Sequence, residues 1–249
     1  DKPSSTASDY GIPEGNFYLA LYAGKDDNTS LTATIHDQHP WLTPHIFEID
    51  NERDKKRHDM HGDIYYHLLQ AAAQGRILGI CGGPMCRTWS ICLHKPDRQG
   101  HPGKPLRGRS EPDCWGKREN TPKDFDKIDG DSLLLIMQLA LYETAQHHNQ
   151  DKNQQLPFLL EHPADPANHS KWPTANECST IWETNLIKHF ADRHRALKHT
   201  WPQCATGHDH EKYTTALTIN MPKARKLDNL QCNHNHKTKE QVNTSDMSR

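Results

Sequence analysis

The chain has 249 residues, enough for one large α/β domain or two small ones, and only 33% of them are hydrophobic. Its 30 Lys and Arg nearly balance its 32 Asp and Glu, which argues against a protein that grips nucleic acid over its whole surface. The longest apolar stretch, 133–142, is too short to cross a bilayer, which takes about 20 residues. Seven cysteines without framework spacing, and no secretory leader pattern, predict a reduced, intracellular protein, nuclear or cytoplasmic.

Residues 1–16 are polar and contain Pro and Gly, so we expect a flexible lead-in. The apolar and aromatic run at 17–24 ends in Gly and is typical of a buried strand. A helix capped near Asn28 or Thr29 is expected next. The run at 45–50 then predicts a second short strand, which ends in two carboxylates.

Residues 62–75 have apolar side chains at helical spacing and a Gly at the end, which predicts a helix. The run RILGICGG at 76–83 predicts a third strand. From 84 to 128 the chain is rich in Pro, Gly, Lys and Arg, and a loop of this length is uncommon unless it is functional or disordered. Between Arg87 and Arg118 this segment has eight Lys or Arg against three Asp or Glu, so we expect a long basic loop.

Apolar side chains return at 129–150, which we predict to be a helix buried over most of its circumference. The run at 156–163 predicts a strand closed by Glu-His-Pro. Residues 177–190 predict an amphipathic helix in which Thr180 and Glu183 form a capping box.

The run YTTALTIN at 213–220 predicts the last strand, and the polar tail at 222–249 is expected to be disordered. One α/β domain therefore spans 17–221. Strands that alternate with helices predict a parallel sheet with helices on both faces. Such sheets bind ligands beyond the carboxyl ends of their strands.

Chemically distinctive residues follow four of the predicted strands: Gly24 with its loop, Glu48 with Asp50, Cys86, and Glu161. The Gly-Gly-Pro turn before Cys86 is compatible with the display of a nucleophilic thiolate, although a packed, inert Cys is equally compatible with it. A carboxylate at the end of an apolar run is costly unless it is paired or exposed. Glu161 therefore either caps a helix or meets an Arg, or it faces the same cleft as Cys86 with a raised pKa.

The second strand's carboxylates have two readings as well. Glu48 and Asp50 can accept hydrogen bonds from ribose hydroxyls, as acidic residues do in nucleotide-binding sheets, or can simply be solvated. Asp63 is in the position of a helix N-cap. The His-rich pieces at 208–210 and 232–236 lack the paired spacing of zinc ligands, so we predict no metal site.

Taken in order, five motifs resemble those of the cytosine-C5 methyltransferase family: LYAG (21–24), EID (48–50), GDI (62–64), GGPMCRTWS (82–90) and EHP (161–163). The likeness covers about residues 17–163 and is greatest to divergent, mobile-element-associated members. It implies a Rossmann-like, S-adenosylmethionine-dependent methyltransferase sheet. It also implies methyl transfer to C5 of cytosine in DNA, or alternatively RNA, through a covalent adduct with Cys86, while Glu161 holds or protonates N3.

The resemblance also implies the binding residues. Those that would line the cofactor are Tyr22, Ala23, Gly24, Glu48, Asp63, Gly83 and Pro84. The target base has to leave the stack, and the residues of the basic loop that would bind the nucleic acid are Arg87, Trp89, Arg107, Arg109 and Trp115. A partner or a further domain would supply target recognition.

Two other interpretations stay open at this point. The first is a methyltransferase fold that has lost catalysis and serves as a nucleic-acid-binding or scaffolding domain of a mobile-element protein. The second is a small-molecule enzyme of another class that has a nucleophilic Cys on an α/β sheet. Binding of the cofactor would separate methyl transfer from both.

Overall fold

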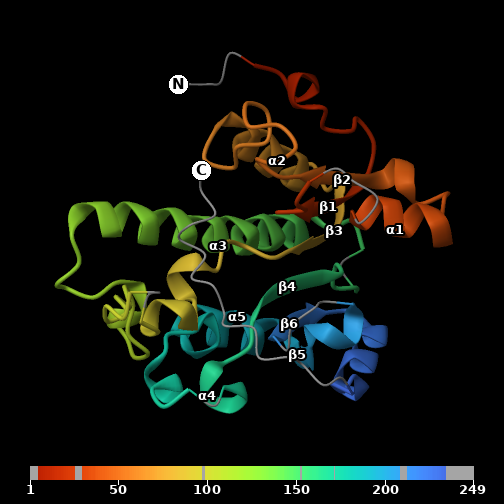
Figure 1. Cartoon of the computed structure of the whole chain (residues 1–249). Helices are drawn as coiled ribbons and strands as arrows, with labels where there is room; N and C mark the ends of the chain where they lie inside the picture. The colour runs from red at the N-terminus through yellow and green to blue at the C-terminus, as the bar shows by residue number, and fades with distance from the viewer. Residues whose placement is uncertain are drawn as a thin grey trace. The chain divides into compact units, whose positions relative to one another are not determined.

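The computed structural model describes residues 5–25, 30–96, 99–151, 153–170, 172–207 and 212–233. It is an α/β structure with a six-stranded sheet in the order β2-β1-β3-β4-β6-β5 (Figure 1). The strands are β1 (Phe17–Leu21), β2 (Ile46–Ile49), β3 (Ile77–Gly82), β4 (Phe158–Pro163), β5 (Leu197–Pro202) and β6 (Tyr213–Ile219). The α-helices are α1 (Leu31–Gln38), α2 (Asp63–Ala73), α3 (Pro122–His148), α4 (Pro166–His169) and α5 (Asn185–His194).

The chain forms two compact units. The first comprises the described residues up to Met85 together with Leu133–Glu161 and Thr218–Met221. The second comprises Cys86–Ser132, His162–Leu217 and the described residues from Pro222 onward. Each unit is described separately below.

The strand order of the first unit contains a topological switch point. β1 pairs in parallel with β2 on one side and with β3 on the other, and β3 pairs in parallel with β4. The chain therefore builds outward from β1 to β2 and then returns to the other side of β1 for β3. In open α/β sheets, ligands bind where the strand order reverses in this way, beyond the carboxyl ends of the strands.

The sheet is mixed, which corrects the prediction of a wholly parallel one. In the second unit the Gln203 backbone N–H donates to the carbonyl of Lys212, and the Thr200 hydroxyl meets that of Thr215 at 2.7 Å. From position 203 back to position 200, the paired residue advances from 212 to 215. Residues pair in this opposite order only when the two strands are antiparallel. β5 itself was not predicted, because Leu197–Pro202 has no sustained apolar run.

In the first unit, α2 follows its sequence signals. Its apolar positions are buried at Ile64, Leu68, Ala71 and Ala72, as helical spacing predicts. Gly75 follows the helix with a φ of +71°, a left-handed conformation that glycine adopts at little cost. α1 is capped by Ser30, whose side chain accepts a hydrogen bond from the Ala33 N–H; the expected caps Asn28 and Thr29 lie outside the described residues.

The prediction of one helix over 177–190 was wrong. Two threonines cap two separate elements there. Thr180 accepts from the N–H of Trp182 at the start of a 3₁₀ turn, and Thr184 accepts from the N–H of Ile187 at the start of α5. The Glu183 carboxylate pairs with Lys188 at 2.8 Å instead of forming a capping box.

The segment 84–128 is partly structured rather than one long loop. It contains 3₁₀ turns at Arg87–Trp89, Ile91–His94 and Asp113–Trp115, and α3 already begins at Pro122. Part of the polar tail is also structured, because Pro222–Asn229 form a 3₁₀ helix. Among the described helices, none has both the length and the apolar character required to cross a membrane.

Candidate functional site

The loop after β1 lies at the switch point, and its backbone is tied to the β2 side. Tyr22 has a φ of +59°, unusual for a residue with a side chain, and its hydroxyl donates to the Leu134 carbonyl at 2.7 Å. Burial raises the pKa of Tyr22. The Ala23 N–H donates to the Ile49 carbonyl, and the Gly24 N–H donates to Asp50 Oδ2 at 2.9 Å. Both amides therefore stabilise the loop.

Glu48, predicted to bind a ribose, has a structural role instead. Its side chain is only 4% exposed, and its Oε2 forms an ion pair with Arg53 at 2.8 Å. Its Oε1 accepts the N–H of Thr32 in the first turn of α1. Arg53 also donates to the Gly24 carbonyl at 2.9 Å, so this pair fixes the loop after β1. A carboxylate with both oxygens engaged inside the unit does not fit a ribose hydroxyl, which corrects that prediction.

The Gly-Gly turn after β3 lies directly against Glu161, the residue predicted to act on the base. A Cβ placed on Gly83 would lie 2.8 Å from Glu161 Oε2, so any side chain there would displace the carboxylate from its place against the turn. Pro84 follows and is buried. The structure thus places Gly83, Pro84 and Glu161 in the same unit, at the carboxyl ends of neighbouring parallel strands.

Gln138, on α3, ties the same two strand ends together and was not identified from the sequence. Its fully buried side chain donates from Nε2 to the Gly82 carbonyl at 3.3 Å and to the Leu159 carbonyl at 3.0 Å. A Cβ on Gly82 would lie 2.9 Å from Gln138 Oε1. Nothing in the sequence marks this glutamine, because it is one polar residue in an apolar helix.

Asp63 and Gly24 are the predicted cofactor residues with the most room around them. Asp63 is exposed in the first turn of α2, where the N-cap is Gly62 rather than Asp63 itself. Gly24 has a φ of +72°, and a Cβ there would meet no atom within 4 Å. Open space beside Gly24 fits a ligand at the end of β1, whereas Glu48 does not fit one.

In the second unit, Cys86 precedes a 3₁₀ turn that is anchored to a buried carboxylate. Cys86 is half-buried, and its carbonyl accepts the N–H of Trp89 at 3.0 Å. Asp131 Oδ2 accepts both the N–H and the hydroxyl of Thr88, at 3.0 and 2.8 Å. Asp131 Oδ1 accepts from Arg87 Nε at 2.9 Å. The Arg87 side chain is itself 56% exposed, so it can also face a ligand.

Arg107, predicted to contact phosphate, lies in the core of the second unit. It is 1% exposed, and its guanidinium stacks 3.9 Å from the centre of the Trp89 ring. Burial lowers its pKa to about 10, against the opposing effect of Asp131, so it stays charged at neutral pH. Trp89 is buried as well. Neither side chain can reach a nucleic acid from this position, which corrects both predictions.

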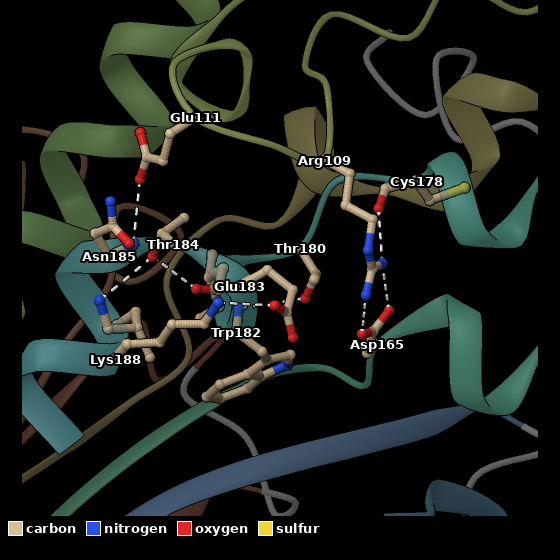
Figure 2. Close-up of polar contacts among 12 residues, drawn as sticks. Arg109, Glu111, Asp165, Cys178, Thr180, Trp182, Glu183, Thr184, Asn185 and Lys188 are labelled. Carbon is tan, nitrogen blue, oxygen red and sulfur yellow. Dashed lines mark hydrogen bonds and ion pairs between the residues drawn. The ribbon is translucent and has the colours of Figure 1, made fainter. Parts of the chain in front are cut away.

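The other predicted nucleic-acid residues are engaged within the second unit. Arg109 makes a bidentate ion pair with Asp165, at 2.8 and 2.5 Å, and also donates to the Cys178 carbonyl, as Figure 2 shows. The hydrogen bond that Arg109 donates to Asp165 raises the pKa of Arg109. Trp115 is half-buried, with its ring 5.9 Å from that of Trp89. Of the five predicted residues, Arg87 is the one whose side chain is mainly in solvent.

His162 is a buried, neutral histidine beside this core. Its ring centre lies 6.3 Å from those of Trp89 and Trp182, and desolvation lowers its pKa to about 3. Its Nδ1 has no hydrogen-bond partner within the described part of the protein. The indole N–H of Trp182, labelled in Figure 2, donates to the Pro163 carbonyl at 2.7 Å.

The candidate residues fall into two sets, one in each unit. The first holds the loop after β1, the Gly-Gly turn and Glu161, and the second holds Cys86 and the network around Asp131. No group of three or more His, Cys, Asp or Glu suited to a metal ion occurs in the described ranges, while 208–211 and 234–249 lie outside them. No family model matches the chain, and no curated protein matches it.

Proposed function

We propose that this protein is a methyltransferase of the cytosine-C5 type, which uses S-adenosylmethionine and acts on cytosine in DNA or, alternatively, RNA. The observation that carries the proposal is the contact between Gly83 and the carboxylate of Glu161. The turn that leads into Cys86 thereby lies against the carboxylate that the resemblance assigns to the base. The switch point between β1 and β3 supports the same proposal, because it offers a ligand position beside both loops.

The chemistry that these residues would perform begins with the thiolate of Cys86. Its sulfur forms a bond to C6 of the target cytosine, and the C5–C6 π electrons move toward C5 and N3. Glu161 holds or protonates N3, so that negative charge does not build up on the ring. After C5 has been methylated, water takes the C5 proton and the C5–H electron pair restores the C5–C6 double bond. The Sγ–C6 electron pair then returns to Cys86 as the thiolate, and Glu161 takes back any proton that it gave to N3.

S-adenosylmethionine would supply an electrophilic methyl group to the activated C5, and its sulfonium would leave as a neutral thioether. The residues that would hold it are those at this edge of the first unit, namely the loop from Tyr22 to Gly24, Asp63, and the turn at Gly83 and Pro84. Open space lies beside Gly24, and Asp63 is exposed. Glu48 is left out of this set because Arg53 and Thr32 occupy its two oxygens.

Covalent trapping tests the proposal. The full chain is incubated with S-adenosylmethionine and an oligonucleotide that contains 5-fluorocytosine, whose fluorine blocks the final loss of the C5 proton. We expect a denaturant-stable adduct in the wild type and in Cys92→Ala, which removes another half-buried thiol, and none in Cys86→Ala. An adduct that survives Cys86→Ala, or none with any DNA or RNA, would contradict the proposal.

One set of observations favours a second candidate, a methyltransferase fold that binds nucleic acid without catalysis. The amides of Ala23 and Gly24 and the carboxylate of Glu48 all serve the loop itself. Fewer polar groups are therefore left for a cofactor at the end of β1. Calorimetric titration with S-adenosylmethionine separates the two candidates: the enzyme binds it, whereas the second candidate binds oligonucleotides and shows no heat with the cofactor.

A further inference from the structure

The three residues that follow Cys86 are each held by a buried side chain of the second unit. Asp131 accepts from the Arg87 guanidinium and from both the N–H and the hydroxyl of Thr88. Arg107 donates from Nε to the same Thr88 hydroxyl at 3.0 Å and stacks on Trp89. The turn that begins at Cys86 is therefore fixed on one side by a carboxylate and on the other by a guanidinium.

The buried charges of this network are paired and hydrogen-bonded within the unit, as a buried charge has to be. The Asp131 side chain is 0% exposed, and a carboxylate in such a place is tolerated only when it is paired and hydrogen-bonded. The charged groups around it are Arg87, which contacts it directly, and Arg107, which reaches it through Thr88. The far side of Arg107 is held by the carbonyls of Cys114 and Ile128.

We propose that Asp131 is the positioning residue for the Cys86 thiol, with Thr88 as the link and Arg107 as the support behind it. The inference rests on the proposed function, in which Cys86 attacks the base. A nucleophile has to be held close to its attack geometry, and a displacement of about 1 Å can cost about 100-fold in rate. On this view the basic segment 84–128 supplies a scaffold for the Cys turn as well as charge for a ligand.

Substitutions at Thr88 test the inference, because its hydroxyl is the atom that Asp131 and Arg107 share. Thr88→Val keeps the side-chain shape and removes that oxygen, whereas Thr88→Ser retains it. Thr184→Val is the matched control, since it removes another fully buried hydroxyl of the same unit, at the start of α5. If Thr88→Val does not fold, Asp131→Asn replaces it. For each variant we would measure the thermal midpoint, oligonucleotide affinity, adduct rate, and hydrogen exchange of the amides at 88 and 89.

We expect Thr88→Val to slow adduct formation by about 100-fold with unchanged oligonucleotide affinity, and Thr88→Ser and Thr184→Val to form the adduct near the wild-type rate. Exchange at 88 and 89 should rise in Thr88→Val alone. Equal adduct rates or equal exchange in Thr88→Val and Thr184→Val would overturn the inference. If the wild type forms no adduct, the proposed function fails, and hydrogen exchange still decides whether Asp131 and Thr88 hold the Cys turn.

Discussion

The burial of Arg107 leads to a prediction that separates a structural from a nucleic-acid role. Arg107→Ala removes donors to the Thr88 hydroxyl, the Cys114 carbonyl and the Ser132 hydroxyl, as well as the stacking on Trp89. The Ile128 carbonyl keeps the Ser132 hydroxyl as a donor at 2.7 Å, so the Cys114 carbonyl is the main acceptor left without Arg107.

The expected cost follows from these contacts. An unsatisfied buried carbonyl costs about 1–3 kcal/mol, and loss of one partner from a buried charged network costs about 3–5 kcal/mol in all. Arg107→Ala should therefore lower the free energy of unfolding by about 3–5 kcal/mol, a large share of the stability of a typical domain. Lys188→Ala is the control, because that side chain pairs with Glu183 at a site where both partners are exposed, and its loss should cost about 1 kcal/mol or less.

Urea unfolding followed by tryptophan fluorescence measures both variants, because Trp89 lies against Arg107. The salt dependence of oligonucleotide binding gives a second measurement. A phosphate contact contributes to the slope of log affinity against log salt. We expect that slope to be unchanged in a folded Arg107→Lys variant. A loss of less than 1 kcal/mol in Arg107→Ala, or a shallower salt slope in Arg107→Lys, would refute this reasoning.

Three further predictions concern the turn, the buried histidine and the thiols. Gly83→Ala should abolish adduct formation, because its Cβ would displace the Glu161 carboxylate, whereas Gly15→Ala, with open space around it, should form the adduct normally in the same assay. Because burial holds the pKa of His162 at about 3, the unfolded chain takes up a proton below pH 6.5 that the folded chain excludes. The free energy of unfolding should therefore fall by up to about 1.4 kcal/mol per pH unit between pH 6.5 and 5. In urea titrations, the free energy of unfolding of His162→Phe should depend less on pH over this range. Burial raises the pKa of three other thiols to between about 11 and about 12, those of Cys81, Cys114 and Cys178. Iodoacetamide at pH 7.5 should therefore label half-buried Cys86 before these three, as measured by peptide mass spectrometry. Faster labelling of any of the three would contradict the structure.

The strands that the sequence predicts well are those with uninterrupted apolar runs. β1 and β3 are buried at most positions and β4 at alternate ones, and their apolar runs carry their own signal. The helix expected over 177–190 failed because Thr180 and Thr184 are both good caps, and a pattern of spacing alone does not show which of them begins the α-helix.

In the candidate site, the sequence predicted those features that depend on residues close together in the chain, such as the glycine turn. The two glycines at the end of β3 reflect close approaches, of Gly82 to Gln138 and Leu21 and of Gly83 to Glu161, and glycine is a strong signal of such places. The burial of Arg107 was not predictable, because its partners are spread between Thr88 and Ser132 and a basic residue in a polar segment is typical of an exposed one. Asp131 and Gln138 were missed for the same reason, since their partners lie far away along the chain.

The contact between Gln138 and Gly82 constrains how this chain can vary in evolution. The two residues are 56 positions apart, yet each defines the space that the other occupies. A Cβ at position 82 would lie 2.9 Å from Gln138 Oε1 and 3.0 Å from both the Cβ and the carbonyl oxygen of Leu21, so a shorter residue at position 138 does not by itself make room for one. Homologous sequences should therefore keep glycine at position 82 even where position 138 varies, because the neighbouring strand as well as the distant helix closes the space beside it.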